Sequence, residues 1–396
     1  MERSWSAIPS DRASSDRAGD GERLLLAPVT ITPTKPVLPT HTKGFLWVDA
    51  LYRGTRALGD VEYLWNTRSA CLAGQALRYW EYLDRTFGDA DLAGLSVHEL
   101  GELYVKAHAE PAPPYPLLRP YAERAEQGWV HPASERILRA WADQLGLLHV
   151  LDPGFFADRP YRLTVDELIG LLADRHLCLD HRRFGGPAYL DGTRWGMPLR
   201  PVVSADGHAN YLLMVLRDLV PRIAEYDRVL LVHDEEIGHD YVLVERILGA
   251  LGARTSRLAL GRVPIPGAAG SSRSGGWAGT ALDELAALCL DQVGPDVYRL
   301  GMRIYFINTL QRTGGSPVDL RLLHRAMTRA EGLLARADHD APANYDAPAG
   351  RDAGTAGELR RLLTPSGWVD PYRLTCRLLA KDGRGPSRRL IEEVLL

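Results

Sequence analysis

The segment from Gly270 to Gly275 reads GSSRSG, and it concentrates hydroxyl groups and one guanidinium between glycines. Hydroxyls and backbone N–H groups donate hydrogen bonds to phosphate oxygens, and a guanidinium neutralises phosphate charge. Ser271, Ser272, Arg273 and Ser274 are therefore candidate ligands of a polyphosphate, with Arg273 and Ser272 in catalytic roles. Because a cluster of small residues is by itself more typical of a plain surface loop, this interpretation depends on the surrounding sequence.

His41 is a further candidate catalytic residue, and the elements around it predict where its imidazole lies. Residues 24–32, LLLAPVTIT, have the composition of a strand, residues 45–59 have the apolar spacing of a helix, and residues 61–67 read as a second strand. A strand, loop, helix and strand in this order build a parallel sheet, whose ligands bind at the carboxyl ends of the strands. An imidazole there, beside a helix N-terminus, suits contact with nucleotide phosphates or ribose. An exposed loop histidine is the alternative.

A third polar group follows the apolar run VLLV at 229–232, which is typical of a central parallel strand. Residues 233–236 read HDEE, and His239 comes soon after. Carboxylates in that position favour contact with a ribose or an amino group, and Glu235 is the candidate. Two histidines with this separation are weak metal spacing, so we expect no metal site here.

Five blocks in chain order resemble the catalytic core of the arginyl branch of the class I aminoacyl-tRNA synthetases. LPTH, which ends at His41 and is followed by Asp49, stands where the family has HxGH and an aspartate. NTRSACLAGQ and GELYVKAHAE resemble the family segments NHVGDWGTQFG and LYVxAxxE. The block from VVSADGHANYLL to DEEIGHDYVLVERILGALGA resembles a fourth segment, and GSSRSG resembles the MSTR(S/K)G form of the KMSKS loop. The resemblance covers roughly residues 24–335.

The resemblance implies an α/β fold, a doubly wound and Rossmann-like parallel sheet with a helical insertion and a short helical C-terminal tail. We expect five parallel strands, with VTIT, VEYLW and VLLV among them, and a buried strand at residues 145–152, LGLLHVLD. The expected organisation is a disordered N-terminus at 1–23, a core at 24–319 with its insertion at about 101–200, a helix at 320–337, a linker at 338–357 and a small tail at 358–396.

The resemblance also implies an ATP site and an amino-acid site. The implied ATP-binding residues are Thr40, His41, Glu235, His239, Ser271, Ser272, Arg273 and Ser274, with Mg²⁺ on the phosphates. The implied amino-acid-binding residues are Asn66, Gln75, Tyr211, Met214 and Asp218. Where the family carries the carboxylate that pairs with the arginine guanidinium, this chain has Leu213-Met214-Val215. A less polar pocket and an amino acid other than arginine follow, unless Asp218 supplies the missing charge.

These features favour a ligase that activates an amino acid with ATP as an aminoacyl-adenylate and passes the acyl group to an amine of a small molecule or a peptide. Such a truncated relative suits specialised metabolism. Residues 358–396 are too short for the family's anticodon-binding domain, so tRNA is a possible but disfavoured partner. Two alternatives stay open: an aminoacyl-tRNA-dependent acyl transferase, and a non-catalytic protein that binds an amino acid or a nucleotide.

The composition limits the number of domains and the kinds of partner that the chain can have. The chain has 396 residues, of which 45% are hydrophobic and 24% are charged, enough for one large or two medium domains. The net charge of −3 provides no overall basic field, so we expect no DNA partner. The four cysteines form no CxxC pair and read as reduced thiols of a cytoplasmic protein. No apolar run approaches the length of a membrane span, so we expect no membrane association.

Overall fold

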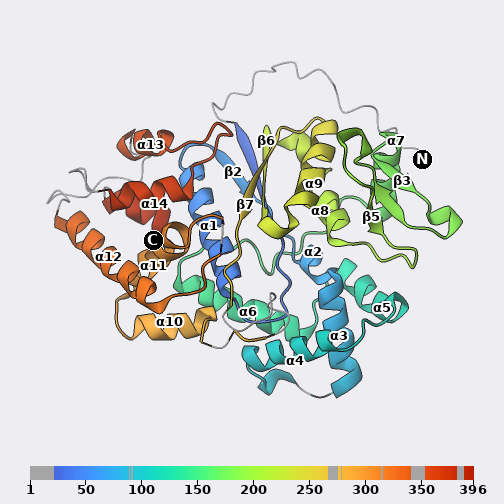
Figure 1. The fold of residues 1–396 in the computed structure, drawn as a ribbon, viewed down its shortest axis with the longest axis horizontal. Coiled ribbons are helices and arrows are strands. Elements are labelled where there is room, and N and C mark those ends of the chain that lie inside the picture. The colour runs from blue at the N-terminus through green and yellow to red at the C-terminus, as the bar shows by residue number, and fades with distance from the viewer. Residues whose placement is uncertain are drawn as a thin grey trace.

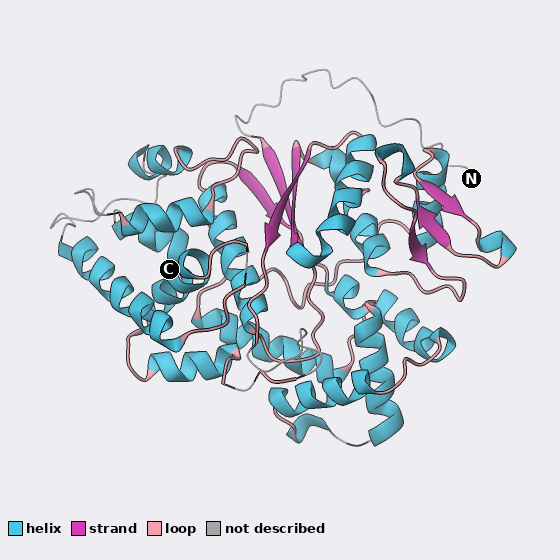
Figure 2. Ribbon diagram, in the orientation of Figure 1, coloured by secondary structure: helices cyan, strands magenta, loops and turns pink. Residues whose placement is uncertain are grey.

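The computed structural model describes residues 22–88, 90, 92–265, 275–277, 279–313, 315–339, 353–380 and 388–396. Figure 1 shows a parallel sheet between two groups of helices, and Figure 2 shows that helix dominates the rest of the molecule. Among the described residues, no helix combines the length and the apolar character that crossing a bilayer requires.

The parallel sheet is the centre of the α/β core. Its strands are β1 (Arg23–Pro28), β2 (Asp60–Tyr63), β6 (Arg228–Asp234) and β7 (Thr255–Leu260), in the order β2-β1-β6-β7. All three pairings are parallel, and Leu26 of β1 stands opposite Tyr63 on one side and Leu230 on the other. The central strands are continuous apolar runs because helices cover both faces of the sheet.

Two helices connect the strands at this core. Helix α1 (Pro39–Arg56) leads from β1 to β2, and α9 (Gly238–Ala250) leads from β6 to β7. Figure 1 shows α1 on one side of the sheet and α9 on the other, as a doubly wound sheet requires. Both helices begin after the carboxyl end of a strand, so both N-termini lie at the same edge of the sheet.

A long, mostly helical stretch separates β2 from β6. Its helices are α2 (Thr67–Cys71), α3 (Gly74–Phe87), α4 (Val97–Ala109), α5 (Tyr115–Glu126), α6 (Pro132–Leu147), α7 (Val165–Asp174) and α8 (Tyr211–Leu219). It also holds a small antiparallel sheet of β3 (Cys178–Asp180), β4 (Ala188–Leu190) and β5 (Arg200–Val203). Figure 1 shows α3 to α6 below the parallel sheet and β3 to β5 beside α8.

The helices after β7 form a group on the α1 side of the sheet (Figure 1). They are α10 (Leu282–Leu290), α11 (Pro295–Arg303), which continues as a π-helix over Ile304–Thr309, α12 (Leu320–His339), α13 (Ala353–Arg360), α14 (Pro371–Leu379) and α15 (Arg388–Leu395). Within this group, the π-helix, α14 and α15 pack directly against α1.

One buried ion pair fixes α11 to α1. The Oδ2 atom of Asp49 lies 2.5 Å from a guanidinium nitrogen of Arg303, and both side chains are buried. The Oδ1 atom of Asp49 accepts hydrogen bonds from Arg53 Nε and from the backbone N–H of Leu151, each at 3.0 Å. Because both oxygens of this carboxylate accept from donors, two of which belong to cations, its charge is compensated in the core.

Three expectations from the sequence are wrong for the described residues. The first strand ends at Pro28, so VTIT at 29–32 is not a strand but the loop that follows one. The parallel sheet has four strands rather than five. Residues 145–152 form the end of α6 and a loop instead of a strand, because α6 extends to Leu147.

Candidate functional site

The carboxyl ends of all four parallel strands open on one cavity of about 780 Å³. The ends of β1, β2, β6 and β7 supply its walls, together with the first turns of α1 and the side chains of Lys35 and Gln75. The volume lies within the range of about 300–1,000 Å³ that is usual for ligand sites. Ligands of open α/β sheets bind at this edge, so this cavity is the candidate site.

The imidazole of His41 faces this cavity from the first turn of α1. Its Nδ1 atom accepts a hydrogen bond of 3.3 Å from the backbone N–H of Leu38, so the ring proton resides on Nε2. Burial, together with the positive charges of Lys35 and Arg262, lowers the pKa of His41 to about 3. The imidazole is therefore neutral at physiological pH and remains a hydrogen-bond donor.

Two side chains of α1 fasten its N-terminus to the segment after β7. The hydroxyl of Thr40 accepts from the backbone N–H of Val263 at 3.0 Å. The ammonium of the buried Lys43 donates to the carbonyl oxygens of Gly261, at 2.8 Å, and Arg312, at 3.1 Å. Burial lowers the pKa of Lys43 to about 8. Thr40 lines the cavity, but its hydroxyl is already bonded within the chain.

The β6–β7 side of the cavity is charged. Asp234 ends β6, Glu236 follows it, and Arg262 follows β7. A guanidinium nitrogen of Arg262 lies 2.8 Å from the Glu236 carboxylate, and its Nε lies 3.9 Å from that of Asp234. Burial raises the pKa of Asp234.

The β2 side of the cavity has no carboxylate among the described residues. Phe45, Tyr63, Trp65 and Gln75 line it, and the three aromatic side chains are buried. The indole N–H of Trp65 donates to Thr67 at 3.1 Å. The Gln75 Oε1 atom accepts from the Tyr104 hydroxyl at 2.9 Å.

Lys35 is a cavity residue that the sequence reasoning missed. Its side chain is buried, and its ammonium lies 4.7 Å from the centre of the Tyr104 ring. Trp141 of α6 donates its indole N–H to the Lys35 carbonyl oxygen at 2.9 Å, and its ring centre lies 6.0 Å from that of His41. The available signal was a lone cation in the proline-rich loop between β1 and α1.

The structure separates the residues that the sequence assigned to an amino acid. Gln75 lines the large cavity, whereas Met214 lines a different cavity of about 360 Å³ between α5 and α8. Asn66 Nδ2 donates to Asp218 Oδ1 at 2.7 Å, and these two buried side chains line neither cavity. The Tyr211 hydroxyl donates to the Asp240 carboxylate and lines neither cavity.

The remaining ATP candidates lie at the same sheet edge or outside the described residues. Glu235 and His239 are exposed at the start of α9, next to cavity residues, but their side chains do not line the cavity. The loop candidates Ser271, Ser272, Arg273 and Ser274 lie outside the described residues. Their roles stay predictions from the sequence.

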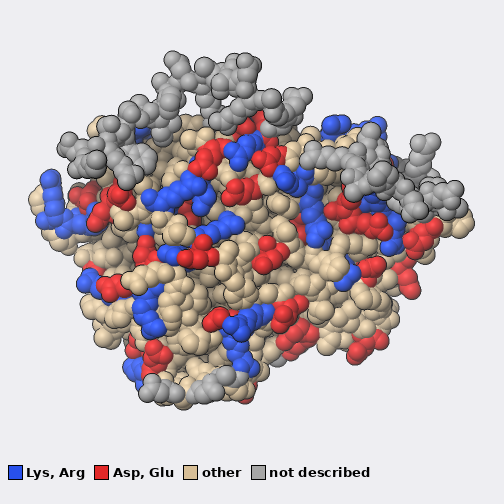
Figure 3. Space-filling model, turned by 180° about the vertical axis from the view of Figure 1, so that it is seen from behind, with Lys and Arg blue, Asp and Glu red and all other residues tan. Residues whose placement is uncertain are grey.

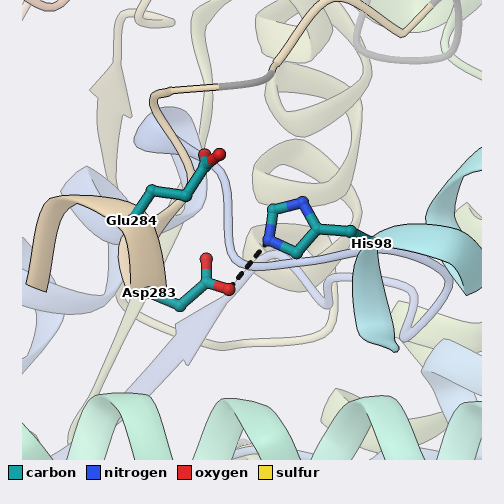
Figure 4. A group of neighbouring side chains, drawn as sticks. All are labelled: His98, Asp283 and Glu284. Carbon is teal, nitrogen blue, oxygen red and sulfur yellow. Dashed lines mark hydrogen bonds and ion pairs between the residues drawn. The ribbon is translucent and has the colours of Figure 1, made fainter. Parts of the chain in front are cut away.

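One group of side chains has a composition that suits a metal ion. His98 of α4 and Asp283 and Glu284 of α10 place ligand atoms within 4.8 Å of one another (Figure 4). His98 Nε2 lies 2.8 Å from Asp283 Oδ2, and the two oxygens of Glu284 accept the backbone N–H groups of Gly279 and Ala281. These bonds cap α10 and dock it on α4, which accounts for the group without an ion.

The fold of the chain occurs in known enzymes. It superimposes on Thermus thermophilus arginyl-tRNA synthetase with a TM-score of 0.57 and 15% identity, covering 86% of this chain and 69% of that enzyme. It superimposes on Plasmodium falciparum arginyl-tRNA synthetase with a TM-score of 0.58 and 11% identity, covering 91% of this chain and 65% of that enzyme. The fold is that of a class I aminoacyl-tRNA synthetase core. No protein-family model and no curated protein matches the chain.

Proposed function

We propose that the chain is a ligase that activates an amino acid with ATP and transfers the acyl group to an amine. One observation carries the proposal: donors and cations converge with carboxylates in a single cavity at the carboxyl edge of a synthetase-like sheet. His41 and Lys35 supply a donor and a cation, and Asp234 and Glu236 supply the carboxylates.

The α1 side of the cavity suits the phosphates. The first N–H groups of an 18-residue helix point toward this edge and attract negative charge. The neutral His41 ring donates through Nε2, and the Lys35 ammonium neutralises charge. Thr40 acts by positioning α1 against Val263. Ser271, Ser272, Arg273 and Ser274 are assigned to the phosphates on their sequence pattern alone.

The β6 side suits the sugar. Carboxylates accept hydrogen bonds from ribose hydroxyls, and we assign Asp234 and Glu236 to this role because both line the cavity at its β6 end. Glu235 and His239 neighbour this side and complete the proposed ATP site.

The proposed reaction has two balanced steps. An oxygen of the amino-acid carboxylate attacks the α-phosphorus of ATP, the bond between the α-phosphorus and the bridging oxygen breaks, and pyrophosphate leaves. The nitrogen of an amine then attacks the acyl carbon, AMP leaves with the bonding electron pair, and the amine loses a proton. Such chemistry needs positioning and charge stabilisation rather than a protein nucleophile.

Mg²⁺ fits this donor set. Mg²⁺ is usually held mainly by substrate phosphates and water, so the phosphates bound at the α1 side would supply most of its ligands, while Asp234 at the same edge could add one carboxylate oxygen. When bound, it would offset the charge of the phosphates.

The proposed acceptor is an amine of a small molecule or a peptide, in specialised metabolism, with tRNA as the disfavoured alternative. The four cysteines are free thiols, three of them buried, which suits the reducing cytoplasm that we propose as the location.

Amino-acid-dependent exchange of labelled pyrophosphate into ATP tests the proposal. We expect exchange that requires the protein, Mg²⁺ and one class of amino acid. His41→Ala should abolish most of it, and Glu245→Ala, in α9 and paired with Arg257 rather than lining the cavity, is the control. Absence of exchange with every amino acid, while the protein is folded, would refute the proposal.

A further inference from the structure

The cavity has charged side chains at its β6–β7 end and mainly aromatic side chains at its β2 end, and this contrast indicates which amino acid it binds. Resting on the proposed function, we infer that the acyl substrate is an amino acid with an uncharged, mainly apolar side chain, held over the carboxyl end of β2. The inference concerns the amino acid alone and leaves the acceptor open.

The strand order separates the two ends. β2 and β7 are the edge strands of the sheet, with β1 and β6 between them. Adjacent strands are spaced by about 4.8 Å, so the edge strands stand about 14 Å apart. An aminoacyl-adenylate that stretches along this edge therefore meets different side chains at its two ends.

Charge decides the direction of the ligand. Asp234, Glu236 and Arg262 gather at the β6–β7 end and suit the polar sugar. His41 and the N-terminus of α1 lie along the middle of the edge and suit the phosphate. The β2 end is left for the amino-acid side chain.

The side chains at the β2 end are carbon-rich. Phe45 and Trp65 are buried, with ring centres 6.1 Å apart. The indole N–H of Trp65 is turned to Thr67, so the ring offers carbon to the cavity. Gln75 and the Tyr63 hydroxyl are the polar groups here, and the Gln75 amide nitrogen makes no hydrogen bond with the described residues because only its Oε1 is bonded, to Tyr104. The end therefore suits a hydrocarbon or aromatic group, with an uncharged polar group as the largest polar addition.

A cationic side chain does not fit this end. No carboxylate of the described residues lines it, and an unpaired buried cation is costly. The sequence suggests Asp218 as a replacement for the missing carboxylate that would pair with a cationic substrate. Its two oxygens, however, already accept hydrogen bonds from Asn66 at 2.7 Å and Ser69 at 2.6 Å. The Lys35 ammonium lies 4.7 Å from the centre of the Tyr104 ring, and the proposed function assigns its charge to the phosphates rather than to the amino-acid side chain.

A panel of amino acids in the pyrophosphate exchange assay tests the inference. Phenylalanine, tyrosine, leucine and methionine represent the apolar class, and arginine, lysine, aspartate and glutamate the charged class. We expect at least one apolar member to support exchange tenfold faster than every charged member. A faster charged member would overturn the inference while the proposed function stands. Absence of exchange with all of them would remove both.

Gln75→Glu tests the location of the side-chain end. A carboxylate there should raise the exchange with arginine or lysine relative to the apolar amino acids by at least tenfold, because it pairs with the cation. Gln292→Glu, an identical change at an exposed position, should leave the ratio unchanged. Calorimetric titration of the unchanged protein with the preferred amino acid and with arginine gives a second readout. An unchanged ratio in a folded Gln75→Glu variant would overturn the assignment of this end.

Discussion

At the scale of single residues, His41 shows how its own helix prepares a side chain for binding. The backbone N–H of Leu38 occupies Nδ1, so the proton must be on Nε2, and the half-buried ring stays neutral. The sequence predicted that His41 lies at the carboxyl edge of the sheet. It could not predict the tautomer, which depends on a hydrogen bond to the helix N-cap.

Replacing His41 should separate donation from packing. His41→Ala removes the Nε2 donor, and we expect exchange to fall about 10²-fold, as for other preorganised donors. His41→Gln offers an amide donor and should retain part of the rate. Steady-state exchange kinetics with circular dichroism as the folding control measure both effects. Equal rates for His41→Ala and the unchanged protein would exclude a role for this imidazole.

The pKa of His41 also predicts how stability depends on pH. The pKa is about 3 in the folded protein against the usual 6.5, so the unfolded chain binds a proton first as the pH falls. The free energy of unfolding should therefore decrease as the pH drops below about 6.5 toward 3. Burial also lowers the pKa of His131, His208 and His233, which adds to the slope.

The contribution of His41 can be isolated with His41→Gln, which should flatten this slope. Urea unfolding at pH 7.0, 6.0 and 5.0 measures it. His239→Gln, at an exposed position, is the matched control and should keep the original slope. An identical slope in His41→Gln and the unchanged protein would contradict a neutral, half-buried ring.

A further prediction for a single residue concerns Arg273, which lies outside the described residues. If the GSSRSG segment binds phosphate, Arg273→Ala should lower ATP-dependent activity by about 10²-fold or more, and Arg273→Lys should retain part of it. The melting temperature should change little. Normal activity of Arg273→Ala would leave the segment as an ordinary surface loop.

At the scale of elements, α1 joins the site to the rest of the core. Its first turns hold the cavity through Thr40 and Lys43, and its middle carries Asp49, which pairs with Arg303 of α11. The sequence predicted this helix and its place after the first strand. It did not predict where β1 ends, because VTIT has strand composition although it forms the cavity wall.

Asp49→Asn should destabilise the protein without touching the cavity. The change leaves the Arg303 guanidinium, which is fully buried, without its counter-charge, and breaking a buried pair costs about 3–5 kcal/mol. Asp60→Asn is the control, because Asp60 is half-exposed in its pairs with Arg23 and Arg56 and should contribute at most about 1 kcal/mol. Urea unfolding compares the two. Equal decreases in the free energy of unfolding for the two variants would mean that the ion pair of Asp49 and Arg303 does not stabilise the core.

The residues predicted to bind the amino acid show what a resemblance between sequence segments cannot predict. Asn66 and Gln75 belong to one sequence block, yet Gln75 faces the cavity and Asn66 faces Asp218. Asn66 is the N-cap of α2, and Gln75 stands in the first turn of α3. A sequence block gives the order of residues, whereas the helix starts decide which side chains reach a cavity.

At the scale of the whole molecule, the net charge is small, and the face seen from behind carries both signs of charge. Basic and acidic side chains alternate over the face in Figure 3, and the net charge is −3. Binding to tRNA depends on neutralising phosphates and is strongly weakened by salt. The face in Figure 3 offers no continuous basic patch of the kind that tRNA would need.

Filter binding with bulk tRNA tests the choice of acceptor. We expect a dissociation constant no tighter than about 10⁻⁵ M at 150 mM salt, in the range of non-specific binding. An unrelated acidic protein of similar size serves as the control. Tight, saturable binding that raises the rate of acyl transfer would favour the aminoacyl-tRNA-dependent alternative.

Trp141 has a consequence for redesign. It belongs to α6, far from β1 in sequence, yet its indole holds the Lys35 backbone and its ring lies beside His41. The helical stretch between β2 and β6 is therefore not a detachable module. A chimaera that exchanges this stretch for that of another protein would need to bring an equivalent indole. Without it, the loop before α1 would lose the support that orients the first turn of the helix.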